Sequence, residues 1–282
     1  MLGHHGPDRM TFHNSALARL VPDGNYRADD LARVEAALSD HQTLTFVRLP
    51  SGLYSASWAR ESRAATGYAN VWVRDNIYVA FAHHVTGASH IATEVVEALI
   101  GFFTRDYHRF DDIISGAVDP QDVAIRPHVR FDGRPLCEIG EQRWAHAQND
   151  ALGYFLWLSL TLAASGALTP DENAVSVLTR LVRDFAAIRS WQDEDSGHWE
   201  EQRKVSASSI GTVVVGLEAF AALMRHSGEW RQACGPALGD LASSLAERPA
   251  GAQRTLPNEC VQLASGKNRR YDAALLFLLF PQ

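Results

Sequence analysis

The sequence is poor in the features that mark several common protein classes. Its three cysteines, Cys137, Cys234 and Cys260, lie far apart and form no C-x-x-C motif, so neither a disulfide framework nor a zinc site is predicted. Positive charge is not in excess, because the formal net charge is -7, and this argues against a nucleic-acid partner. We expect no metal, no cofactor and no nucleic acid.

Long hydrophobic runs are also missing. No charge-free apolar run reaches about 18 residues, the length that a membrane-spanning helix needs, so no membrane partner is predicted. Residues 1–14 are polar and lack the apolar centre of a signal peptide. We therefore expect a cytoplasmic protein. A hydrophobic share of 46% with 21% charged residues is typical of a globular domain.

What the sequence does contain is a series of helical patterns. We expect residues 1–28 to be a weakly structured extension and residues 29–282 to form one helical domain. Pro50-Ser51-Gly52 predicts the turn of a short hairpin, and Thr169-Pro170-Asp171-Glu172 predicts a capping box with proline at the first helical position. Apolar residues recur with helical spacing in 29–38, 77–85, 89–102, 151–164, 175–185, 210–224, 230–245 and 273–280.

These helices alternate between two kinds. The helix at 151–164 is apolar on every side, as in a buried helix, whereas the helix at 175–185 is apolar on one face and is expected at the periphery. A buried helix followed by an amphipathic one recurs about every 55 to 75 residues. This plan predicts an all-α fold of the (α/α)6 barrel type with about four of its six helical hairpins. A helical superhelix is the alternative that hydrophobicity leaves open.

A dense cluster of aromatic and charged residues precedes each inner helix. If the inner helices run the same way around a ring, the clusters meet at one mouth, where helix N-termini offer free N–H groups. A single residue of this kind could equally be a helix-end carboxylate or a core tryptophan, but four clusters in equivalent places favour a carbohydrate site. The clusters are residues 68–76, 144–150, 199–201 and 269–272.

The third cluster, Trp199-Glu200-Glu201, carries the strongest chemical signal. A carboxyl group that must keep its proton near neutral pH needs apolar cover or a like charge beside it. Trp199 could supply the first to Glu200, and Glu201 the second. The run therefore favours Glu200 as a general acid.

These motifs resemble those of the glucoamylase family, family 15 of the glycoside hydrolases, and of the related phosphorylase kinase α and β subunits. Trp199-Glu200-Glu201 is similar to the family's general-acid motif, in which the first glutamate protonates the glycosidic oxygen and the second binds sugar hydroxyls. A second motif, similar to the one that lines the −1 sugar subsite, consists of Tyr68, Trp72, Arg74 and Asp75.

The resemblance covers roughly residues 29 to 282. It implies an (α/α)6 barrel, an inverting mechanism and α-linked glucosyl substrates, and we expect a small oligosaccharide as the binding partner. Trp144 and Trp199 are also expected to bind the substrate. Residues expected to bind or orient the sugar from a second tier are Gln148, Asp150, Arg203 and Lys204.

The resemblance places the general base, a second glutamate, beyond the fourth hairpin and past residue 282. Glu259 precedes the fourth helix and does not match that position. The expected activity is exo-acting hydrolysis of α-1,4 or α-1,6 glucosidic bonds in short oligosaccharides. Two alternatives remain open. One is a non-catalytic glucan-binding or regulatory module of the phosphorylase kinase type, and the other is an inactive truncated family member with exposed apolar residues on its last helix.

Overall fold

The computed structural model describes residues 19–21, 25–43, 45–57, 68–140, 144–251, 258–262, 266–267 and 272–278. The chain divides into two compact units, Met1–Phe46 and Val47–Gln282. The first unit contains helix α2 (Ala28–Asp40), which confirms the helix predicted at 29–38. Its start is capped by Asp30, whose carboxylate accepts the backbone N–H of Arg27 at 2.8 Å.

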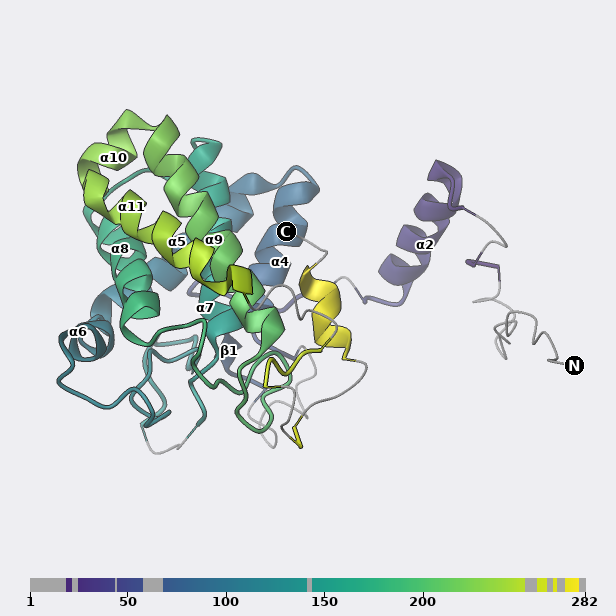
Figure 1. The fold of residues 1–282 in the computed structure, drawn as a ribbon. Helices are drawn as coiled ribbons and strands as arrows, with labels where there is room; N and C mark the ends of the chain where they lie inside the picture. Colours follow the sequence, from purple (N-terminus) through teal and green to yellow (C-terminus); the bar gives the residue numbers. More distant parts are fainter. Residues whose placement is uncertain are drawn as a thin grey trace, which may run out of the picture. The chain divides into compact units, whose positions relative to one another are not determined.

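The second unit consists of helical hairpins (Figure 1). Its inner helices are α4 (Val73–Val85), α7 (Asn149–Ala164) and α9 (Ala207–His226). Each is followed by outer helices: α5 (Ser89–Arg105) and α6 (His108–Ser115), then α8 (Glu172–Ala187), then α10 (Gly228–Cys234) and α11 (Pro236–Glu247). The 3₁₀ helices η1 (Arg248–Gly251) and η3 (Ala273–Leu278) follow.

Burial separates the two kinds of helix as the sequence predicts. Nearly every side chain of α7 is buried, whereas α8 buries one face that includes Val177, Leu181 and Phe185. Helices α7 and α9 cross so closely that their backbones nearly touch, because a Cβ added at Gly153 would lie 2.7 Å from the backbone nitrogen of Val213. Glycine at this crossing is therefore required by packing.

Helix α9 is by length and composition apolar enough to cross a membrane. Within this domain, however, 72% of its apolar window is buried, and α9 packs against α7 and α11. It has the burial of a core helix.

Two of the expected boundaries are wrong in a way that matters for the site. Helix α4 begins at Val73 rather than at residue 77, and α7 begins at Asn149 rather than at residue 151. Arg74 and Asp150 consequently lie in first helical turns, not in the preceding loops. Backbone N–H groups at a helix start favour carboxylates there.

The later helices also differ from expectation. The outer helix predicted at 230–245 is broken at Gly235, which has a φ of +86° and precedes Pro236. In place of the helix predicted at 273–280 the structure has η3 (Ala273–Leu278), in which Ala274 is buried and Leu276 is 63% exposed. Residues 279–280 lie outside the described residues.

The predicted capping box at residue 169 is wrong. The N-cap of α8 is Asp171, whose Oδ1 accepts the backbone N–H of Ala174 at 2.7 Å. Pro170 precedes the cap instead of opening the helix. The carboxylate two residues later competes better for the free N–H groups than the threonine does.

The only extended pairings among the described residues are short. The hairpin predicted around Pro50 is confirmed, since Arg48 pairs with Tyr54 and the N–H of Leu49 donates to the carbonyl of Leu53 at 2.7 Å. Strands β1 (Val71–Trp72) and β2 (Arg130–Phe131), which the sequence did not predict, pair antiparallel with Trp72 opposite Arg130. This pairing holds Trp72 directly before α4.

Candidate active site

The loop that carries Glu200 is closed at its base by two backbone hydrogen bonds. Asp195 and Lys204 exchange N–H and carbonyl groups at 2.9 Å in each direction. The loop is fixed to the start of α7 by Ser196, whose backbone N–H and hydroxyl both donate to the carbonyl of Ala147. Glu200 itself has a φ of 55°, in the left-handed region that a non-glycine residue seldom adopts.

Arg74 connects three of the four predicted clusters. Its guanidinium is buried, with 6% of the residue exposed. Nη1 donates to Oδ2 of Asp150 at 2.6 Å and to the carbonyl of Gly197 at 3.4 Å. Nη2 donates to Oε1 of Gln148 at 3.1 Å and to Oε1 of Glu200 at 3.3 Å. The first turn of α4, the start of α7 and the Glu200 loop thus meet at one side chain.

The charges of this group stabilise one another. Burial alone would lower the pKa of Arg74, but the nearby carboxylates of Asp150 and Glu200 raise it above its usual value. Burial likewise acts to raise the pKa of Asp150, but the charge of Arg74 and the nearby His198 hold that pKa below its usual value. Arg74 and Asp150 therefore form a charged pair inside the protein, where removal of one partner would leave the other uncompensated.

An aromatic wall flanks Glu200. The indole Nε1 of Trp72 donates to Oε1 of Glu200 at 2.9 Å. The guanidinium of Arg130 lies 4.9 Å from the Trp72 ring and 4.3 Å from the Trp144 ring, and Tyr68 packs on Trp72 with ring centroids 5.5 Å apart. Cation–π contacts of this kind fix the orientation of the rings.

The environment of Glu200 differs from the one expected from its neighbours in sequence. Trp199 is 42% exposed, and its indole N–H donates to Oδ1 of Asp272 at 2.7 Å. Glu201 is exposed. The described contacts of the Glu200 carboxylate come instead from Trp72 and Arg74, two N–H donors that are distant in the sequence.

Glu200 and Asp75 are the carboxylates that line a hollow of about 350 Å³. Asp75 is open to this hollow, but the surrounding protein removes enough solvation to raise its pKa above the ordinary value. The volume falls in the range of small-ligand pockets. The hollow is lined by Ala56, Tyr68, Trp72, Arg74, Asp75, Tyr78, His198, Trp199 and Glu200.

Three lining residues, Ala56, Tyr78 and His198, are not among the predicted site residues. The Nδ1 atom of His198 lies 3.8 Å from Oδ2 of Asp150, and its ring packs edge-on against Trp199 with centroids 4.7 Å apart. Burial raises the pKa of Tyr78 to about 12. The sequence could have indicated Tyr78 and His198 as site residues, because Tyr78 follows Arg74 by one helical turn and His198 directly precedes Trp199.

Several predicted site residues lie outside the lining. Arg203 bonds to the carbonyl of Glu194 at 2.7 Å and to Gln121, and Lys204 is buried at the base of the loop. Gln148 and Asp150 accept hydrogen bonds from Arg74. Trp144 contacts Arg130 and packs edge-on against Trp72 with ring centroids 6.2 Å apart. Of the fourth cluster, residues 269–271 lie outside the described residues, and Asp272 bonds to Trp199.

Glu259 has a structural partner. Its Oε2 accepts the backbone N–H of Ser208 at 3.0 Å, and its Oε1 accepts the hydroxyl of the same serine. Ser208 lies in the first turn of α9, where such a carboxylate satisfies free N–H groups. Glu259 therefore caps α9 and does not line the hollow.

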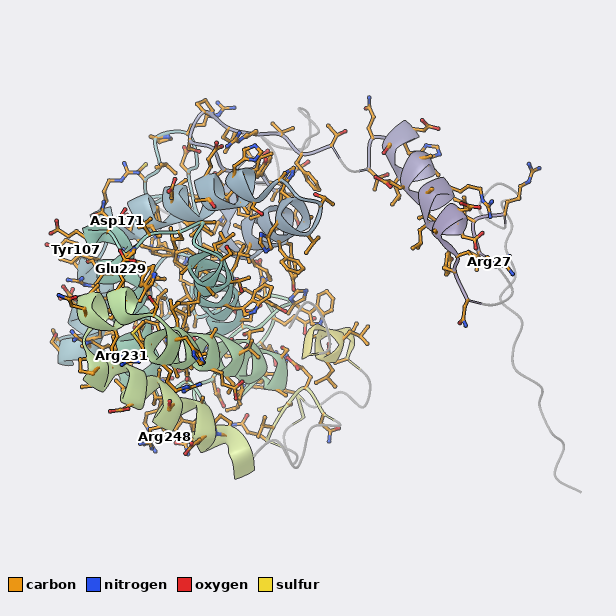
Figure 2. All side chains as sticks on the ribbon, turned by 90° about the horizontal axis from the view of Figure 1, so that it is seen from above. Arg27, Tyr107, Asp171, Glu229, Arg231 and Arg248 are labelled. Carbon is orange, nitrogen blue, oxygen red and sulfur yellow. The ribbon has the colours of Figure 1, made fainter. Side chains whose placement is uncertain are left out.

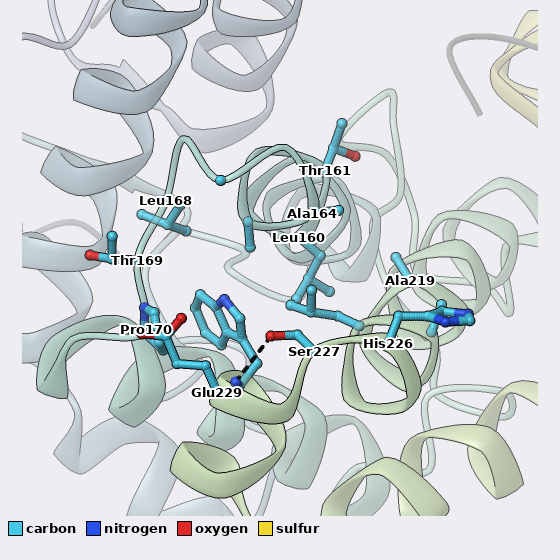
Figure 3. Close-up of a pocket in the computed structure, with 15 residues that line it drawn as sticks. Leu160, Thr161, Ala164, Leu168, Thr169, Pro170, Ala219, His226, Ser227 and Glu229 are labelled. Atoms are coloured by element: carbon cyan, nitrogen blue, oxygen red, sulfur yellow. Dashed lines mark hydrogen bonds between the residues drawn. The ribbon is translucent and has the colours of Figure 1, made fainter.

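A larger hollow, of about 640 Å³, lies at the opposite end of α7 and α9 (Figure 3). Its lining is mainly small and apolar, with Ala164 and Leu160 from α7, Ala219 from α9 and Leu168 from the connection to α8. Glu229 is the carboxylate among its lining residues. The larger hollow is thus mainly apolar, and the charged side chains gather around the smaller hollow.

The fold is that of helical glycosidases. A wild-type glycosidase of known structure superposes with a TM-score of 0.60 over 81% of this chain at 22% sequence identity, and a glycosidase variant in complex with glucose superposes with a TM-score of 0.61. The chain spans 59% of the length of each of these proteins. This likeness favours the (α/α)6 type of arrangement over the superhelix.

The chain belongs to glycosyl hydrolases family 15, whose sequence model matches residues 39–276. It is 25% identical over 180 residues to the uncharacterized lipoprotein YgeQ of Escherichia coli (strain K12), a match that covers 58% of this chain and 67% of that protein. It is also 24% identical over 205 residues to the skeletal muscle isoform of the phosphorylase b kinase regulatory subunit alpha of Mus musculus, covering 64% of this chain and 16% of that subunit. The predicted family is confirmed.

Proposed function

We propose that this domain hydrolyses the α-1,4 or α-1,6 bond at the non-reducing end of a short glucosyl oligosaccharide, with inversion at the anomeric carbon. Glu200 acts as the general acid. Arg74 and Asp75 bind the hydroxyls of the terminal glucosyl ring, and Tyr68 and Trp72 pack against its apolar face. The single observation that carries this assignment is the contact of Arg74 with both Asp150 and Glu200 beside the hollow.

The hydrogen bonds of Glu200 favour the carboxylate that forms once the proton has been given up. Trp72 and Arg74 both donate to Oε1, which leaves Oε2 to carry the proton. That oxygen gives its proton to the glycosidic oxygen as the bond to C1 breaks, and the carboxylate that remains is stabilised by the same two N–H donors. Arg74 thus stabilises the charge that forms on Glu200 during the reaction.

Inversion also needs a water molecule that attacks C1 from the opposite face and a second carboxylate that accepts its proton. The family resemblance assigns this base to a position past residue 282, and Asp75 to the sugar hydroxyls. The proposed activity therefore also requires a second carboxylate that acts as the general base.

The decisive experiment is proton NMR of isomaltose, maltose and trehalose incubated with the protein. We expect the anomeric doublet of β-glucose to grow first from one of the α-1,4 or α-1,6 disaccharides, before mutarotation. Initial release of α-glucose would contradict inversion. Absence of release from all three disaccharides would contradict hydrolysis.

A second function, a non-catalytic glucan-binding or regulatory module, is supported by the similarity to the phosphorylase b kinase regulatory subunit alpha. The same hollow would then bind a glucosyl group without turnover. Titration with glucose and an iminosugar, followed by tryptophan fluorescence, separates the two functions. Binding that Asp75→Asn weakens, without release of glucose from any disaccharide, would favour this second function.

A further inference from the structure

We infer that Asp272 is a positioning residue for Glu200 and that it acts through Trp199. Oδ1 of Asp272 accepts the indole N–H of Trp199 at 2.7 Å. The same oxygen accepts the backbone N–H of Ala274 at 3.0 Å, in the first turn of η3. One carboxylate oxygen thus joins the Glu200 loop to the segment that follows it by 72 residues in the chain (272 minus 200).

The Glu200 loop has a structural reason to need such a contact. A left-handed backbone is strained at a non-glycine residue, and Glu200 has a φ of 55°. Trp199 is 42% exposed, so burial alone does not fix its ring. The hydrogen bond to Asp272 fixes the residue directly before Glu200 and so holds the left-handed turn in place.

The described part of the C-terminal segment also holds the base of this loop. The backbone N–H of Val261 donates to the carbonyl of Val205 at 3.0 Å, and Nε2 of Gln262 donates to Oε1 of Glu194 at 2.9 Å. Residues 258–262 therefore fix the two arms of the loop while Asp272 fixes its tip. This arrangement makes Asp272 a link between the segment and the general acid.

Trp72 provides a probe of this link that needs no turnover. Its indole N–H donates to Oε1 of Glu200 at 2.9 Å, whereas its distance to Asp272 in sequence is 200 residues (272 minus 72). If Asp272 positions Glu200, loss of the Asp272 carboxylate must change the hydrogen bond of Trp72. If Asp272 only caps η3, its loss should leave the NMR signal of the Trp72 indole N–H unchanged.

The test compares Asp272→Ala, Asp272→Asn and Asp171→Ala by ¹⁵N NMR of the tryptophan indoles. The variants Trp72→Phe and Trp199→Phe identify which signals belong to Trp72 and Trp199. Asp272→Asn keeps an oxygen that accepts both N–H groups. Asp171→Ala is the matched control, because it removes an aspartate oxygen that caps a helix elsewhere. We expect Asp272→Ala to shift the Trp72 and Trp199 indole signals, and the other two variants to leave Trp72 unchanged.

Kinetics adds a second readout that rests on the proposed function. Fluoride leaves with little help from a general acid, so displaced Glu200 should slow isomaltose hydrolysis more than α-glucosyl fluoride hydrolysis. Since a misplacement of about 1 Å can cost up to 10²-fold, we expect Asp272→Ala to lower kcat for isomaltose about tenfold, with a smaller loss for the fluoride. Trp199→Phe added to Asp272→Ala should cause no further tenfold loss.

The two proposals fail in different ways. An unchanged Trp72 indole signal in Asp272→Ala, with the protein folded by circular dichroism, overturns the positioning role whether or not sugar is hydrolysed. A shifted Trp72 signal in a protein without turnover supports the positioning role and counts against the proposed hydrolysis. Equal losses on isomaltose and α-glucosyl fluoride overturn the link to the general acid.

Discussion

The two ends of helices α7 and α9 offer a direct comparison. Beside the start of α7, the first turns of α4 and the Glu200 loop form a hollow of about 350 Å³ lined by Asp75, Glu200 and Arg74, and Arg74 bonds to Asp150 of α7. At the C-terminal ends of α7 and α9 lies a hollow of about 640 Å³ with a mainly small, apolar lining. Figure 1 shows the loops gathered near β1 at the first end and α10 at the second. The smaller hollow is the one lined by two carboxylates and a guanidinium group.

The buried charges follow the same division. At the first end Nη2 of Arg126 donates to both carboxylate oxygens of Asp193 at 2.7 Å, and Asn149 donates to the same carboxylate at 2.9 Å. At the second end Asp171 and Glu229 lie at the edge of the domain (Figure 2), and both are exposed. Burying charges destabilises a fold unless they are paired, so a region where they accumulate is a candidate for function.

The largest effect is expected from Glu200→Gln. The amide keeps an oxygen for Trp72 and Arg74, so the fold should remain, but it cannot donate the proton that the leaving group needs. We expect kcat for isomaltose to fall by about 10²–10⁴-fold. Glu229→Gln, the same change at the other hollow, should leave kcat unchanged. Wild-type turnover by Glu200→Gln would show that Glu200 is not the general acid.

A large effect on stability is expected from Arg74→Met. This substitution leaves Asp150 buried without its partner, which should lower the free energy of unfolding by about 3–5 kcal/mol. Arg231→Met is the matched change at the second end, where Nε of Arg231 donates to the carbonyl of Met224, and it should cost about 1 kcal/mol. Urea denaturation of both variants measures the difference, and equal costs would contradict a buried charge centre at the first end.

A pH-dependent effect is expected from Asp184→Asn. Burial raises the pKa of Asp184 to about 7, so the folded protein holds a proton that the unfolded chain has released above about pH 4. The wild type therefore loses stability between about pH 4 and pH 7 through this group. We expect the Tm of Asp184→Asn relative to wild type to rise across that range. A difference that stays constant with pH would exclude this proton.

The smallest effects compare the hollows by adding the same bulk to each. Ala56→Leu narrows the first hollow and should raise KM about tenfold, equivalent to about 1.4 kcal/mol of lost binding. Ala164→Leu, in the second hollow, should change neither KM nor kcat, and stability by less than about 0.5 kcal/mol. If Ala164→Leu raised KM more than Ala56→Leu does, the sugar would bind in the second hollow, which contradicts the proposed site.

Much of the fold could be predicted from the spacing of hydrophobic residues along the sequence alone. The all-round apolar run of α7 and the one-faced run of α8 identify inner and outer helices because burial dictates composition directly. Hydrophobic spacing predicts the starts of α4 and α7 too late, because Arg74 and Asp150 are polar residues whose burial depends on each other. The β1–β2 pair and the break at Gly235 depend on long-range and backbone geometry that this spacing does not encode.

The site could be predicted in its main residues but not in its connections. The motifs indicated Arg74, Asp75 and Glu200, which the structure places around one hollow. The sequence predicts that Trp199 and Glu201 provide the environment of Glu200, whereas its described hydrogen bonds come from Trp72 and Arg74. Partners more than a hundred residues apart in the chain are set by tertiary packing, which a single sequence does not report.

The most direct test of the central assignment is a crystal structure of Glu200→Gln soaked with isomaltose. We expect a glucosyl ring in the hollow beside Trp72, with its hydroxyls bound to Arg74 and Asp75 and its glycosidic oxygen within hydrogen-bonding distance of residue 200. A sugar bound instead in the hollow between Ala164 and Ala219, with the site beside Arg74 empty at saturating isomaltose, would contradict this assignment.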